Sequence, residues 1–61
     1  MEYSIGDVVK FKVGSDEQRG EVQFIEKCQK EDILYINSYS GWAYKVPGKG
    51  IVARILAKNK K

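Results

Sequence analysis

Five short segments with strand-like sequence, separated by turn residues, cover most of this 61-residue chain. They span residues 7–13, 21–27, 33–38, 42–46 and 51–57. In the first segment, Val9, Phe11 and Val13 alternate with Lys10 and Lys12, which is the pattern of a strand with one buried face. Strands that recur about every 8–12 residues are typical of all-β domains. The sequence therefore predicts an all-β fold.

The chain is long enough for one domain only. A sheet in so short a chain protects its edges best by closing on itself, so we expect a single small five-stranded barrel. We assign residues 1–57 to this domain. The remaining residues 58–61, with the sequence KNKK, are expected to form a basic disordered tail.

Residues 14–32 allow more than one interpretation. Residues 14–20 are expected to form a loop bounded by glycines. In the strand that follows, Val22 and Phe24 fall on one face and Ile25 on the other, which suggests a bulge. A helix over residues 15–30 also fits the spacing of the apolar residues, with a capping box at its start. Gly20 and the β-branched and aromatic residues after it favour the strand.

Several classes of function are disfavoured by composition. With one cysteine and no histidine, an internal disulfide and a zinc centre are not expected. We expect Cys28 to be a small, partly buried packing residue. The sequence has no nucleophile motif and no glycine-rich phosphate loop, so we expect neither an enzyme nor a cofactor.

Membrane attachment and secretion are also disfavoured. The N-terminal sequence MEYSIGD lacks the basic and apolar regions of a secretory signal. No apolar stretch approaches the ~20 residues that a membrane-spanning helix requires. We therefore expect a cytoplasmic protein.

Charge is distributed unevenly along the chain. Residues 1–32 contain five basic and eight acidic side chains, whereas residues 33–61 contain six basic and no acidic ones. The first part has a net charge of −3 and the second part +6, which gives +3 for the chain. A cationic second half can steer an anionic partner to one face of a small domain.

Three stretches of sequence resemble parts of a known class of domain. IGDVVKFK and RGEVQFIEK, with Gly6, Asp7, Val9, Gly20 and Val22, are similar to the opening of small SH3-like barrels of the KOW and Tudor type. WAYKVPGKGIVARIL is similar to the end of that fold, where an aromatic strand leads through a tight turn into the last strand. The resemblance covers most of residues 5–56 and implies an SH3-like five-stranded barrel.

The same resemblance implies a binding module. KOW-type modules commonly bind RNA or a protein of the transcription and translation machinery, and Tudor-type modules hold peptide side chains in aromatic cages. Small standalone barrels of this sort are also frequent in phages and other mobile elements. We therefore expect a nucleic-acid partner, with a protein partner, peptide or self-association as the alternatives.

The aromatic residues divide into core and binding candidates. Phe11 and Phe24 alternate with valines and are expected in the core. Trp42 shares a face with Tyr44 and Val46, so we expect it to be mainly structural, although its polar edge keeps it a binding candidate. Tyr39 is the better binding candidate, because it lies in a turn between two serines.

The basic residues complete the candidate site. Lys45, Lys49 and Arg54, together with the tail, are expected to form a cationic patch beside Tyr39 and Trp42. Lys10 and Lys12 project from one face of the first strand, where they either bind phosphate or protect a solvated edge.

Overall fold

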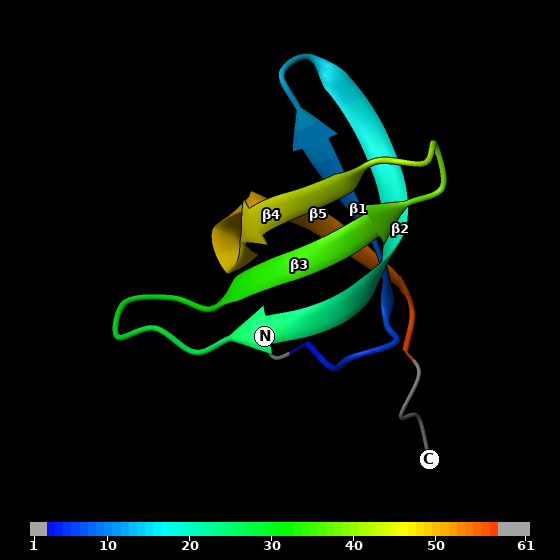
Figure 1. The fold of residues 1–61 in the computed structure, drawn as a ribbon. Coiled ribbons are helices and arrows are strands. Elements are labelled where there is room, and N and C mark those ends of the chain that lie inside the picture. Colours follow the sequence, from blue (N-terminus) through cyan, green and yellow to red (C-terminus); the bar gives the residue numbers. More distant parts are fainter. Residues whose placement is uncertain (1–2, 58–61) are drawn as a thin grey trace.

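The computed structural model describes residues 3–57, so the predicted tail at residues 58–61 lies outside the described residues. The fold is all-β, as predicted, and forms one antiparallel sheet with the order β4-β3-β2-β1-β5 (Figure 1). Its elements are β1 (Val8–Val13), β2 (Asp16–Glu26), β3 (Ile33–Ser38), β4 (Ala43–Pro47), the 3-10 turn η1 (Gly48–Gly50) and β5 (Ile51–Leu56). The described chain contains no helix with the length and apolar character needed to cross a membrane.

The first hairpin is longer than the sequence predicts. The register pairs Val13 with Asp16, so that only Gly14 and Ser15 form the turn. Gly14 has a φ of 63°, as the first central position of a type II′ hairpin turn requires. Residues 16–20, expected in a loop, extend β2 instead, and the alternative helix over residues 15–30 is wrong. Pairing with β1 satisfies the backbone groups of this polar segment, and that outweighs its weak strand propensity.

A bulge in β2 reverses the expected placement of Phe24. Val22 pairs with Ile36 and Phe24 with Tyr35, which leaves Gln23 as the extra residue. The bulge itself was predicted, but it moves Phe24 to the outer face, where it is 56% exposed, and turns Ile25 toward the core. The prediction that Phe24 is a core residue is therefore wrong.

Six apolar side chains form the core. They come from the first four strands: Val9, Phe11, Val22, Leu34, Ile36 and Val46. Tyr44 packs edge-on against Phe11, with 5.5 Å between ring centres. Figure 1 shows that β2 is strongly curved, with β1 and β3 paired along its two sides, and the six core side chains form one cluster.

Gly20 allows β2 and β3 to approach closely at this centre. A Cβ atom at this position would overlap the backbone oxygen of Asn37 and would lie 2.6 Å from Cγ2 of Ile36. Any other residue would have to push the two strands apart. This close approach gives a physical reason for glycine at the start of the RGEV segment.

A buried carboxylate ties the two ends of the described chain together. Asp7 is 1% exposed, accepts a hydrogen bond from the backbone N–H of Ser4 at 2.8 Å, and lies 3.5 Å from Arg54 on β5. The backbone of residues 6 and 7 also pairs with Val22 of β2. Asp7 therefore connects the N-terminal segment and β5 to the middle of the sheet.

The last strand follows β1 irregularly. Val8 pairs with Leu56 and Val9 with Arg54, so Ile55 is an extra residue in β5. Lys10 pairs with Ala53 and Phe11 with Ile51, so Val52 is a second extra residue. These two residues are 48% and 50% exposed, respectively. The strand is therefore bulged at two points along its length.

Candidate nucleic-acid interface

Tyr39 and Trp42 lie together in the turn between β3 and β4, and each is 69% exposed. The expectation that Trp42 is mainly structural is therefore wrong. Trp42 lies opposite Ser38, just before the regular pairing of β4 begins at Ala43, and at this end of the strand the core does not cover its ring. The inward side chains of that strand are Tyr44 and Val46, as predicted.

Hydrogen bonds hold this turn in a defined shape. We call residues 39–42 the aromatic turn. The backbone N–H of Ser38 donates to the carbonyl of Trp42 at 2.7 Å, and that of Gly41 donates to the carbonyl of Ser38 at 2.9 Å. The hydroxyls of Ser38 and Ser40 lie 2.8 and 3.0 Å from Oε1 of Gln18, on β2. The rings are thus exposed, whereas the backbone that carries them is well connected.

Basic side chains lie beside the aromatic turn in the same row of the sheet. Lys10 on β1 pairs with Arg19 on β2, and the backbone N–H of Tyr39 donates to the carbonyl of Arg19 at 2.9 Å. Arg19, Glu17 and Tyr39 line one shallow depression. The row Lys10–Arg19–Tyr39 therefore places two cations next to an exposed ring.

The neighbouring row contains opposite charges. Lys12 pairs with Glu17, and Lys10 lies 3.8 Å from the carboxylate of Glu17. Both side chains of that ion pair are partly exposed, so the attraction between them is weak and Lys10 can readily take another anion as its partner. We call Lys10, Lys12, Arg19, Tyr39 and Trp42 the aromatic-turn site.

The predicted patch of Lys45, Lys49 and Arg54 is not one cluster beside the aromatic turn. Arg54 is engaged with the buried Asp7, and its guanidinium lies 5.9 Å from the ring centre of Tyr3. Across the sheet, Arg54 pairs with Val9, Val9 with Gly20, and Gly20 with Ser38. Arg54 therefore lies three strand spacings, or about 14 Å, from Ser38. The tail that was expected to join this patch lies outside the described residues.

Lys49 lies in a second depression. It is exposed in η1 and lines this hollow together with Tyr3, Lys30, Glu31, Asp32 and Gly48. The backbone N–H of Gly48 donates to the carbonyl of Asp32 at 2.8 Å and holds η1 against the β2–β3 connection. Both signs of charge line this hollow, so it does not select for an anion.

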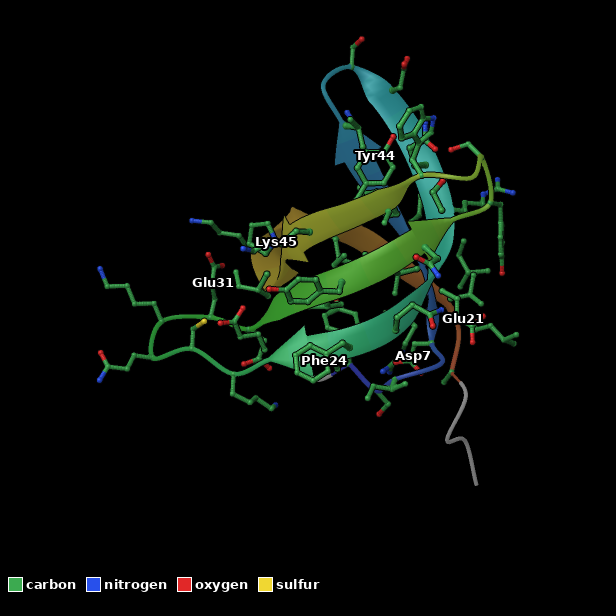
Figure 2. The ribbon with its side chains drawn as sticks, viewed as in Figure 1. Asp7, Glu21, Phe24, Glu31, Tyr44 and Lys45 are labelled. Atoms are coloured by element: carbon green, nitrogen blue, oxygen red, sulfur yellow. The ribbon has the colours of Figure 1, made fainter. Side chains whose placement is uncertain are left out.

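Lys45 belongs to a different surface, on the outer face of β2, β3 and β4 (Figure 2). Its Nζ lies 5.7 Å from the ring centre of Tyr35, whose ring centre is also 5.7 Å from that of Phe24. The hydroxyl of Tyr35 donates to Oε1 of Glu26 at 2.8 Å. We call Phe24, Tyr35 and Lys45 the outer aromatic row.

Sequence reasoning missed Arg19 and the outer aromatic row as parts of a surface. The pairing of Lys10 with Arg19 follows from a two-residue turn at Gly14 and Ser15, and Gly-Ser is a recognisable signal for such a turn. Phe24 reaches the outer face only through the bulge at Gln23, and no turn residue marks that position.

Cys28 is exposed, so its expected role as a packing residue is wrong. It lies in the connection between β2 and β3, where no strand turns it toward the core. Within residues 3–57, no three side chains with metal-binding groups come together.

No family model matches the chain, and the comparisons with curated proteins and with solved structures also find no match.

Proposed function

We propose that the protein is a small non-enzymatic binding module that holds single-stranded nucleic acid at the aromatic-turn site. The observation that carries this proposal is the exposure of Tyr39 and Trp42, 69% each, on a hydrogen-bonded turn next to Arg19 and Lys10. A domain this small gains stability from each apolar ring that it buries. Two rings left outside the core are better explained by the burial that a partner provides.

The chemistry of the site fits unpaired bases. Exposed rings accept bases by stacking without strict sequence preference, and neighbouring cations hold the phosphates. Lys10, Lys12 and Arg19 supply three positive charges, and Asp16 and Glu17 offset part of them. This balance suits two or three phosphate contacts and an affinity in the micromolar range at low salt, about that of non-specific binding.

The single tryptophan makes the proposal directly testable. Titration with an oligonucleotide of eight thymidines at low salt should change the fluorescence of Trp42, because stacking with a base quenches indole. A duplex of the same length should compete poorly, because its bases are already stacked. If no oligonucleotide changes the fluorescence or the mobility of the protein at low salt, the proposal is wrong.

The second candidate function is binding of a protein, peptide or second copy of the chain through the outer aromatic row. Phe24 is 56% exposed and contacts Tyr35, and this pair lies on the sheet face away from the core. For a second copy, sedimentation at rising concentration should detect a dimer that Phe24→Ser dissociates. A monomer at all concentrations excludes self-association as the use of this surface.

We also propose that the curved sheet is an SH3-like barrel of the KOW and Tudor type, and that the protein acts in the cytoplasm. The strand order, with β1 between β2 and β5, and the short turn η1 from β4 to β5 support the barrel (Figure 1). Nuclear Overhauser contacts between β4 and β5 would test its closure. Cell fractionation would test the location.

A further inference from the structure

Gln18 has an unusual place among the polar residues of β2. It pairs with Phe11 in the register, so its side chain starts from the core side of the sheet and is half-buried. From there, Oε1 lies 2.8 Å from the hydroxyl of Ser38 and 3.0 Å from that of Ser40. One amide oxygen thus connects β2 to residues 20 and 22 positions further along the chain.

Gln18 makes more contacts than are needed to give the buried hydroxyl of Ser38 a hydrogen-bond partner. Ser38 is buried, but its hydroxyl also lies 2.9 Å from that of Ser40 and accepts from the backbone N–H of Ser40 at 3.1 Å. Ser40 is exposed and can bond to water. The hydroxyl of Ser40 therefore does not need Gln18 as a hydrogen-bond partner. The effect of this bond is to attach the middle of the aromatic turn to β2.

The regular pairing of β2 with β3 ends at Gly20 and Ser38. Beyond that pair, the backbone bond from Tyr39 to Arg19 and the side chain of Gln18 join the turn to β2. Gly41 has few steric limits on its backbone, so these two contacts add to the bonds within the turn in restricting how the turn is oriented relative to β2. A binding surface that is already ordered loses less entropy when its ligand arrives.

We infer that Gln18 is a positioning residue of the aromatic-turn site: its amide oxygen fixes the turn so that Tyr39 and Trp42 are held ready for stacking before the ligand binds. This inference rests on the proposed function. It adds that the affinity of the site depends on a side chain that acts through the position of the turn.

The test compares four substitutions at three positions. Gln18→Leu keeps the size of the side chain and removes the acceptor, whereas Gln18→Glu keeps an acceptor for both hydroxyls. Gln23→Leu is the matched control. Gln23 is an exposed residue of the same strand, and its side-chain amide donates to the carbonyl of Glu21. Ser40→Ala removes only the exposed hydroxyl and serves as a milder second variant.

Two measurements are made on each folded variant. Time-resolved fluorescence anisotropy of Trp42 without ligand reports the motion of the turn, and titration with an oligonucleotide of eight thymidines reports affinity. Gln18→Leu should increase the local motion of Trp42 and weaken binding about three- to tenfold, with the salt dependence unchanged. Gln18→Glu should restore the wild-type anisotropy, Ser40→Ala should give a smaller change, and Gln23→Leu should change neither measurement.

The outcomes separate this inference from the proposed function. If the wild-type chain binds and Gln18→Leu binds equally well or leaves the motion of Trp42 unchanged, the inference alone is overturned. The same holds if Gln18→Glu does not restore the anisotropy. If the wild-type chain binds no oligonucleotide, the proposed function is overturned and the inference falls with it.

Discussion

Trp42 and Phe11 show how differently this chain uses its aromatic rings. Phe11 is fully buried and contacts Tyr44, whereas Trp42 lies outside the sheet on a turn. Burying a large aromatic side chain stabilises a fold by about 1.5–3 kcal/mol, which is a large fraction of the stability of a small domain. Because Trp42 is exposed and does not contribute this stability, its replacement best separates an effect on folding from an effect on binding.

Trp42→Ala should therefore leave the fold almost unchanged and weaken binding strongly. We expect a loss of at most about 0.5 kcal/mol in the free energy of unfolding, as for a surface substitution. Loss of one stacked base should cost about 1–3 kcal/mol of binding energy. Denaturation followed by circular dichroism and titration with a labelled oligonucleotide measure the two quantities. A loss of stability near 3 kcal/mol would show that the ring packs against the core after all.

Gly20→Ala should have the opposite effect. The added methyl group would overlap the backbone oxygen of Asn37 and press on Ile36, so β2 and β3 would have to separate. We expect a loss of about 2–3 kcal/mol in the free energy of unfolding. Gly48→Ala is the matched control, since its Cβ would lie 3.5 Å from the nearest oxygen, that of Asp32. Equal losses in the two variants, measured by urea denaturation, would contradict this account of Gly20.

At the scale of the strands, periodicity predicted where chain segments run but not which way every side chain faces. Strands β1, β3, β4 and β5 begin and end within about a residue of the predicted ranges. The strand β2 begins five residues before the predicted start at residue 21, because pairing with β1 extends it over a polar segment. Its bulge at Gln23 then exchanges the faces of Phe24 and Ile25. Both departures depend on how β2 pairs with its neighbouring strands, and the residue pattern within β2 does not contain that information.

The ion pair between Asp7 and Arg54 attaches β5 to the rest of the sheet. Asp7 is buried and Arg54 is partly exposed, so Arg54→Ala leaves a buried carboxylate without this cation. We expect a loss of about 2 kcal/mol in stability, below the usual cost of breaking a fully buried pair. Hydrogen exchange should show the amides of β5 opening before those of β3.

Lys45→Ala is the control for this prediction, because it removes an exposed cation on the outer face. It should change stability by less than about 0.5 kcal/mol. Arg54→Ala with unaltered stability and unaltered exchange in β5 would show that the pair contributes nothing to holding the strand.

For the whole molecule, the location of the cations predicts how salt affects binding. With two or three phosphates contacted, the slope of log affinity against log salt should have a magnitude of about 1.4–2.1. Lys10→Ala should reduce this magnitude by about 0.7, because one phosphate contact is lost. Lys45→Ala should leave the slope unchanged, since Lys45 lies over Tyr35 in the outer aromatic row. The opposite ranking of these two variants would move the site to the outer face.

The candidate site was predictable only in part, and for a reason of geometry. Tyr39 stood out in the sequence because it lies between turn-forming serines, and its exposure agrees with that. The cations expected beside it came from the second half of the chain, with Lys10 and Lys12 as separate candidates on the first strand. The register instead brings Lys10 and Arg19 next to the turn. Arg54 looked available because its partner, Asp7, lies 47 positions away in sequence. A single sequence does not reveal such distant pairings.

The two bulges in β5 affect how the protein associates with other molecules at high concentration. In the regular pairing of the described residues, β4 and β5 are the outermost strands, and a long straight edge invites the strands of other molecules to add to it. Val52 and Ile55 break the regular line of donors and acceptors along β5, while Pro47 at the end of β4 contributes no N–H. The strand β5 thus offers no continuous line of backbone donors and acceptors to which a strand of another molecule could add.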